Sequence, residues 1–164
     1  MNKPSISVFT PTHNPKYLEE LYTSLKEQTV SDWEWVIVPN NGAQVTSLQE
    51  DSRVVIKPYP ENEPTTIGGL KAFACSHCSS DYLLEVDHDD LLTPTCMEDI
   101  LSAFKEQSAD FVYGNCAPVR VVGDKWVPDT YRTEIGWEYR EADVIYNGST
   151  IKVLETITPA PSPY

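Results

Sequence analysis

Short apolar runs alternate with helical stripes of apolar residues along the first two thirds of the chain. The runs are bounded by Pro, Asn, Gly or Asp, as strands are. The stripes place apolar residues at i, i+3, i+4 and i+7, which predicts amphipathic helices whose apolar sides form the core. This alternation predicts an α/β fold with a mainly parallel sheet flanked by helices. The predicted strands are 5–10, 33–38, 54–56, 82–86 and 111–113, and the predicted helices are 15–28, 67–78 and 94–106.

Capping and turn residues lie between these elements. Asn14 can cap the first helix and Pro15 can begin it, and Thr93 with Pro94 has the same arrangement before the third helix. The sequence from Pro39 to Gly42 predicts a turn, because Asn and Gly accept left-handed backbone angles. In the second helix Ile67, Leu70, Ala74 and Cys75 form the stripe assigned to the core.

The pattern changes after Cys116. Residues 118–122 and 125–131 flank Gly123-Asp124, which is typical of a β-hairpin. Residues 132–158 show no clear period. Three prolines in residues 158–164 are typical of an extended linker or tail.

The predicted strand 82–86 is mostly apolar and is interpreted as buried. Asp87, Asp89 and Asp90 follow it directly. Carboxylates gathered at the carboxyl end of a strand repel one another, and ligands of open α/β sheets bind at these ends. Oxygen ligands of this kind suit a hard cation such as Mg²⁺ or Mn²⁺. The alternative is a solvated turn whose charges favour the start of a helix.

The composition restricts the partners. The chain of 164 residues has 12 basic and 25 acidic residues and a formal net charge of −13. Such a chain repels nucleic-acid backbones and anionic membranes, so neither is expected as a partner. No apolar run approaches the ~20 residues that span a bilayer, and residues 1–5 lack a signal-peptide core. We therefore expect a cytoplasmic protein without a transmembrane segment.

The four cysteines are expected to be reduced thiols in that compartment. Cys75 and Cys78 enclose His77 in a CxxC pattern, but no second pair of metal ligands follows. Packing of the two thiols at the end of a helix is therefore favoured over a zinc or redox site.

Four segments near predicted strand ends form an ordered set of motifs. They are Ser-Val-Phe-Thr-Pro-Thr-His-Asn at 7–14, Leu-Lys-Glu-Gln-Thr at 25–29, Asp-Trp-Glu-Trp-Val-Ile-Val-Pro-Asn-Asn-Gly at 32–42 and Asp-Tyr-Leu-Leu-Glu-Val-Asp-His-Asp-Asp-Leu-Leu-Thr-Pro at 81–94. In this order they resemble the family 2 glycosyltransferases of the GT-A fold, a Rossmann-like fold. Members of this family are inverting enzymes that use nucleotide sugars. The resemblance covers residues 5–115 well and the rest thinly.

The resemblance implies a division of the chain. Residues 1–115 would form the nucleotide-sugar-binding core, and residues 116–157 the hairpin and the start of the acceptor-side region of the same domain. Residues 158–164 would be the proline-rich tail.

The resemblance also implies roles at the nucleotide. Pro11, Thr12 and Asn14 would lie under the base and ribose, and Asn40 would face the base. Many relatives carry aspartate at the position of Asn40. Since an amide both donates and accepts hydrogen bonds, this difference bears on which base is preferred. Lys71 lies where relatives often have an arginine near the diphosphate, although a solvent-facing helix lysine is an equal alternative.

The segment Asp87-His88-Asp89 matches the DxD motif of the family. By the resemblance, Asp89 would bind Mn²⁺ or Mg²⁺, Asp87 would bind the ribose or reach the metal through water, and His88 would belong to the nucleotide-sugar site. Asp90 could orient the loop or the donor sugar, or be only a charge at a helix start.

The expected function is metal-dependent transfer of a sugar, first of all from a UDP-sugar, to a hydroxyl of an unknown glycan or other acceptor, with inversion. No motif makes Glu134, Glu138, Glu141 or Asp143 the general base. The sequence therefore assigns no catalytic residue. It also assigns no oligomeric state. The alternatives are a non-catalytic or truncated nucleotide-sugar-binding module and another doubly wound protein, such as a nucleotidyltransferase or a phospho-acceptor domain.

Overall fold

A computed structural model gives the structure of the chain. It describes residues 3–107, 109–113, 119–123, 125–128, 139–146 and 149–156. The chain forms two compact units, Met1–Glu106 and Gln107–Tyr164. The predicted boundaries at residues 115 and 157 stay a prediction, and the proline-rich tail lies outside the described residues.

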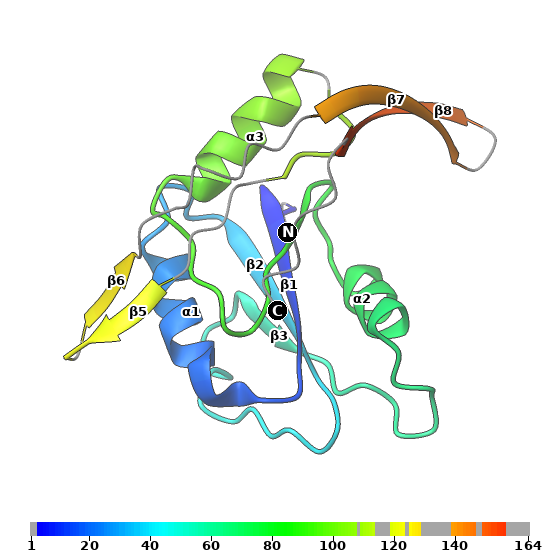
Figure 1. Ribbon diagram of the computed structural model, residues 1–164. Coiled ribbons are helices and arrows are strands. Elements are labelled where there is room, and N and C mark those ends of the chain that lie inside the picture. The colour runs from blue at the N-terminus through cyan, green and yellow to red at the C-terminus, as the bar shows by residue number, and fades with distance from the viewer. Residues whose placement is uncertain are drawn as a thin grey trace. The chain divides into compact units, whose positions relative to one another are not determined.

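The first unit is built on a parallel sheet. Its strands are β1 (Ile6–Thr12), β2 (Trp33–Pro39), β3 (Val54–Ile56) and β4 (Leu83–Glu85), in the spatial order β3-β2-β1-β4. Figure 1 labels β1, β2 and β3 of this sheet. All three pairings are parallel; Ile6 of β1 pairs with Trp33, and Ser7 pairs with Leu83. The chain therefore has the mainly parallel α/β sheet that the sequence predicts.

Helices cover both faces of this sheet. A short 3-10 helix, η1 (Pro15–Tyr17), leads into α1 (Leu18–Lys26), and α2 (Ile67–Ser76) and α3 (Cys96–Gln107) follow (Figure 1). The predicted cap is confirmed, because the Asn14 side chain accepts a hydrogen bond from the backbone N–H of Lys16. Alternate residues of β1 and β2 face the two sides. One core packs them against α1 and α3, and the other packs them against α2.

The predicted strand at 82–86 exists but is only half buried. Val86 is buried and Leu84 packs partly into the core, whereas Leu83 and Glu85 are exposed. The reason is the position of α2, which packs over β1 and β2. Within the described residues β4 pairs only with β1, so it is an edge of the sheet rather than a buried strand.

Two other predictions are wrong in part. The third helix begins at Cys96 rather than at Pro94, because Thr93 to Cys96 forms a turn closed by the N–H of Cys96 on the carbonyl of Thr93 (3.0 Å). No strand forms at 111–113, where Phe111 is 77% exposed and has no core to pack against in the described part of the chain.

The second unit contains two antiparallel hairpins. Strands β5 (Val119–Val122) and β6 (Lys125–Pro128) form the predicted hairpin, with a shorter second strand than expected. Strands β7 (Tyr139–Tyr146) and β8 (Ser149–Thr156) form a hairpin that the sequence analysis missed. The missed signal is Asn147-Gly148 between two strand-like runs, a strong short-range hairpin pattern.

No helix among the described residues is long and apolar enough to cross a bilayer. The cytoplasmic location expected from the sequence stays a prediction.

A partly buried acid, Asp51, anchors the chain between β2 and β3 to α1. Asp51 accepts hydrogen bonds from Arg53 (2.8 and 3.1 Å) and from the hydroxyl of Tyr22 (2.7 Å). The Arg53 guanidinium also lies over the ring of Trp33, 3.8 Å from its centroid. The hydrogen bonds from Arg53 hold the pKa of Asp51 well below its ordinary value.

We expect Asp51→Asn to lower the free energy of unfolding at pH 6 by about 1–3 kcal/mol, as loss of a charge-assisted hydrogen bond does. Because the folded pKa of Asp51 is depressed, its contribution is full above the ordinary pKa of about 4 and is lost as the pH falls below it. The difference between parent and variant should therefore shrink from pH 5 to pH 2 in urea unfolding. A difference that is independent of pH would contradict this account. Asp81→Asn, at an exposed acid, is the control.

Candidate functional site

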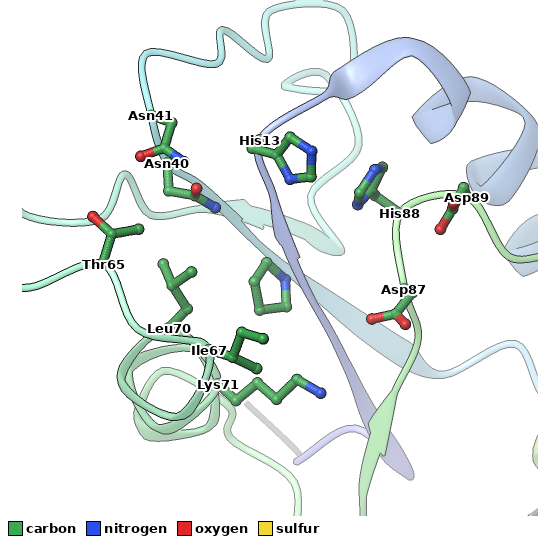
Figure 2. Close-up of a pocket in the computed structure, with 11 residues that line it drawn as sticks. His13, Asn40, Asn41, Thr65, Ile67, Leu70, Lys71, Asp87, His88 and Asp89 are labelled. Atoms are coloured by element: carbon green, nitrogen blue, oxygen red, sulfur yellow. The ribbon is translucent and has the colours of Figure 1, made fainter. Parts of the chain in front are cut away.

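A pocket of about 400 Å³ opens at the carboxyl ends of the strands, a usual size for a small-molecule site. Figure 2 shows Asp87, His88 and Asp89 after β4 along one wall and α2 with Lys71 along the opposite wall. The ends of β1 and β2 lie between these walls. The lining residues are Pro11, His13, Asn40, Asn41, Thr65, Ile67, Leu70, Lys71, Asp87, His88 and Asp89.

The turn after β2 places Asn40, a largely buried residue, at this pocket. Asn41 (φ 51°) and Gly42 (φ 80°) have the predicted left-handed backbone, and the N–H of Ala43 donates to the carbonyl of Asn40 at 3.0 Å. The N–H of Asn40 donates to the carbonyl of Thr12 (2.9 Å), which fixes the turn to β1. Asn40 is only 7% exposed, yet its side-chain amide has no hydrogen-bond partner among the described residues. The polar atoms of this amide are not closed off from solvent, so a ligand in the pocket can reach them.

The acidic segment after β4 forms a tight turn at the pocket wall. The N–H of Asp90 donates to the carbonyl of Asp87 (3.1 Å). Asp90 is the acid whose pKa is raised, first because its carboxyl is partly desolvated and then because of the charges of Asp87 and Asp89. His88 meets His13 of the segment after β1 edge to face, with 5.0 Å between ring centroids. The predicted mutual repulsion of these acids is therefore present at Asp90.

A buried glutamine at the end of α1 holds the chain that follows this turn. Gln28 donates through Nε2 to the carbonyls of Ser24 (3.0 Å) and Thr93 (2.8 Å), and its Oε1 accepts from the N–H of Met97 (3.0 Å). The Ser24 hydroxyl accepts from the N–H of Leu92 (3.3 Å). The chain at Leu92 and Thr93, just after the acidic turn, is thus hydrogen-bonded to α1 and to Gln28, which follows that helix.

Lys71 enters the pocket from α2 and forms an ion pair with Glu85 of β4. Its pKa is raised, first by the hydrogen bond to Glu85 and then by the charges of Glu85 and Asp87, while desolvation opposes them. The lysine is therefore not simply a solvent-facing helix residue. Its ammonium group contacts Glu85 and interacts with the charge of Asp87 on the opposite wall.

The pocket brings together Pro11, Asn40, Lys71, Asp87, His88 and Asp89 of the predicted residues. Thr12 and Asn14 do not line it. Thr12 is fully buried, and its hydroxyl hydrogen-bonds the backbone of Asn14, whose own side chain caps η1. Their side chains shape the start of η1 rather than the pocket surface.

Five lining residues were not predicted. Asn41 and His13 adjoin predicted residues in the sequence, so a wider window around each strand end would have included them. Ile67 was assigned to the core and that is wrong, because it is 74% exposed in the first turn of α2. Thr65 and Leu70 carry no sequence signal for the pocket. A second cavity of about 260 Å³ shares Asn40, Asn41 and Thr65 with the first and extends along the loops after β2 and β3.

The cysteines of the CxxC pattern pack beside the core under α2. Burial raises the pKa of Cys75 and raises that of Cys78 to about 12, so both stay protonated at neutral pH.

The model of the family described as Glycosyl transferase family 2 matches residues 7–155, and the chain belongs to this family. A curated relative, the O-antigen biosynthesis protein RfbC of Myxococcus xanthus, is 25% identical over 114 residues. That match covers 64% of this chain and 9% of the relative.

Solved structures show the same fold. Residues 1–349 of S. aureus TarS, in complex with UDP, match with a TM-score of 0.55 and 24% identity over 65% of this chain and 33% of that one. The mannosyltransferase PcManGT from Pyrobaculum calidifontis, in complex with GDP-Man and Mn²⁺, matches with a TM-score of 0.50 and 19% identity. That match covers 66% of this chain and 34% of PcManGT. The predicted GT-A, Rossmann-like fold is therefore confirmed. The chain spans about a third of each solved neighbour.

Proposed function

We propose that this chain is the nucleotide-sugar-binding part of a metal-dependent, inverting glycosyltransferase. The first candidate for the donor is a UDP-sugar, and the acceptor is a hydroxyl group of an unknown glycan or other molecule. The observation that carries the proposal is the pocket, where Asp87 and Asp89 lie across from Lys71 and the accessible amide of Asn40 has no hydrogen-bond partner among the described residues. Membership of the family agrees with this chemistry.

Asn40 is the residue we assign to the base. An amide offers a donor and an acceptor side by side, and uracil presents an N–H flanked by two carbonyl groups. Pro11 and the exposed Ile67 give the same pocket an apolar surface, against which a flat base or a ribose can lie. Recognition of the base edge by Asn40 follows from this arrangement.

The two acids of the pocket supply carboxylate oxygens, the ligands that a hard cation prefers. Asp87 and Asp89 line the same pocket, and two carboxylates are a usual protein contribution to a Mg²⁺ or Mn²⁺ ion that also keeps waters and binds phosphates. The described residues hold no group of three or more acids, histidines or cysteines placed to bind an ion alone. Asp89 would hold the ion and Asp87 would hold the ribose or reach the ion through water.

The charges suggest how the donor is held and activated. When bound, a divalent cation offsets the negative charge that develops on the departing diphosphate. Lys71 adds a positive charge near the same wall and would offset the charge of a phosphate. Thr12 and Asn14 support the site by fixing the chain after β1.

A second candidate is a nucleotide-sugar-binding module without turnover of its own. Inversion needs a general base for the acceptor hydroxyl. In the described part of the pocket the lining carboxylates are Asp87 and Asp89, and both are assigned to the metal and the donor. Glu134 and Glu138, and the side chains of Glu141 and Asp143, lie outside what the structure describes.

The test is calorimetric titration of the whole chain with UDP, GDP, dTDP and their sugars, with and without Mn²⁺. We expect at least one nucleotide to bind, with an affinity that Mn²⁺ increases. Asn40→Ala should weaken this binding about tenfold, the effect of losing about 1.4 kcal/mol of hydrogen bonding. Asn62→Ala, at an exposed loop amide outside the pocket, should bind like the parent.

A parent chain that binds none of these nucleotides would overturn the proposal. Binding accompanied by transfer of the sugar to an acceptor or to water would favour the glycosyltransferase. Binding without any turnover would favour the nucleotide-sugar-binding module.

A further inference from the structure

Lys71 is the only lining residue of the described pocket with a permanently cationic side chain. Its Nζ is held by the carboxylate of Glu85, a residue that does not itself line the pocket. Both side chains are partly exposed, 37% for Lys71 and 40% for Glu85. Glu85 is therefore placed to control where the ammonium group lies without contacting a ligand in the pocket.

The fold explains why these two residues meet. Glu85 pairs in register with Phe9 of β1, and Phe9 packs in the core against α2. Neighbours in register point to the same face of a sheet, so Glu85 also points to the face that α2 covers. On α2, Lys71 comes one turn after Ile67, which lines the pocket. The pair thus links the helix wall of the pocket to the strand that carries the acidic turn.

We propose that Glu85 is a positioning residue, which fixes the ammonium group of Lys71 at the edge of the pocket, ready for the phosphates of a nucleoside diphosphate. The inference rests on the proposed function, because it takes a nucleoside diphosphate as the ligand. Glu85 lies two residues before Asp87, so one short segment sets the positions of both the acids and the cation.

Two effects of Glu85 on an anionic ligand oppose each other. Its negative charge repels phosphates, and by this effect alone its removal would strengthen binding. Its ion pair restrains a long lysine side chain, whose freedom would otherwise have to be lost when the ligand binds. The charge of an exposed carboxylate is largely screened by water and salt, whereas the freedom of an untethered lysine is not. The restraint should therefore dominate, and removal of Glu85 should weaken binding.

The experiment measures the affinity of the whole chain for UDP and GDP by calorimetry at constant Mn²⁺, at low and at high salt. We expect Lys71→Ala to bind about tenfold more weakly, and Glu85→Ala about threefold to fivefold more weakly, as the loss of a positioned charge would produce. The double variant should bind no more weakly than Lys71→Ala, because Glu85 acts through Lys71. Asp81→Asn, which removes one negative charge at an exposed site of the same unit, should bind like the parent.

A second readout needs no ligand. A carbon-13 NMR titration of Lys71 should show its pKa falling toward the ordinary lysine value in Glu85→Ala, with narrower signals from a freer side chain. Thermal unfolding should be nearly unchanged, because exposed ion pairs contribute little to stability.

The outcomes separate the two proposals. If the parent binds nucleotide but Glu85→Ala binds equally or more tightly, or if the double variant is weaker than Lys71→Ala, the inference is overturned and the proposed function stands. If the parent binds no nucleoside diphosphate, the proposed function fails and the inference fails with it.

Discussion

Replacing Asp89 with alanine should remove the gain in nucleotide affinity that Mn²⁺ provides, lowering affinity in the presence of Mn²⁺ about a hundredfold. Asp89 is one of the two carboxylates that line the pocket, and the described residues form no group of three or more acids, histidines or cysteines that could hold an ion by themselves. Loss of a direct charged ligand to a divalent ion that binds phosphates should cost about 3 kcal/mol, or two factors of ten. Titration with nucleotide, with and without Mn²⁺, measures the loss directly.

The variants Asp87→Ala and Asp81→Ala complete this experiment. Asp87→Ala should reduce affinity both with and without Mn²⁺ if it also contacts the ribose. Asp81 lies before the start of β4, at the end away from the pocket, where it is exposed and pairs with Lys3. Its replacement should therefore change the nucleotide affinity neither with nor without Mn²⁺. An Asp89→Ala protein that keeps the full effect of Mn²⁺ would show that the ion, if one binds, is held elsewhere.

Gln28→Leu should destabilise the first unit by about 3–5 kcal/mol, a large part of the 5–15 kcal/mol that holds a domain folded. Leucine nearly keeps the volume but removes all three hydrogen bonds of the glutamine side chain. The buried N–H of Met97 then lacks a partner, at a cost of about 1–3 kcal/mol, and the two bonds to the carbonyls of Ser24 and Thr93 are lost at about 0.5–1.5 kcal/mol each.

Urea unfolding followed by tryptophan fluorescence checks this prediction, since Trp33 and Trp35 are buried in the same unit. Gln49→Leu is the matched control, because Gln49 is exposed and makes one long hydrogen bond of 3.4 Å to the carbonyl of Val45. A Gln28→Leu variant within 0.5 kcal/mol of the control would mean that water or a shift of the backbone replaces the lost bonds. That threshold is about the usual effect of a surface change.

The sequence allowed the layout of the first unit to be predicted because local signals were strong there. Asn14 before Pro15, and Asn41 with Gly42, each prescribe one backbone conformation, and the structure has them. Apolar spacing located the helices, but it could not show which faces other elements cover. Ile67 fits the helical stripe as well as Leu70 does, yet it borders the pocket because no element of the described structure packs over it.

Those site residues that directly follow a strand in a recognisable motif could be predicted from the sequence. Contacts between residues that are distant in the sequence could not. Asp87, Asp89 and Asn40 are of the first kind. The links of Lys71 to Glu85 and of Gln28 to Met97 are of the second kind, since they depend on how α2 and α1 pack. The hairpin of β7 and β8 was missed for another reason: the turn signal Asn147-Gly148 is convincing only together with the strand-like runs on either side, and no period was recognised in those runs.

The central place of β1 in the sheet has a consequence for synthesis of the chain. Its partners are β2 and β4, so Ser7 stays without its neighbour Leu83 until the ribosome has passed that position. At roughly 5–20 residues per second, this wait lasts on the order of 4–15 s. During that time an apolar strand is exposed on the nascent chain, and pairing between such distant segments is slow in itself. Chaperones that hold extended apolar segments should therefore act on this protein before its fourth strand emerges.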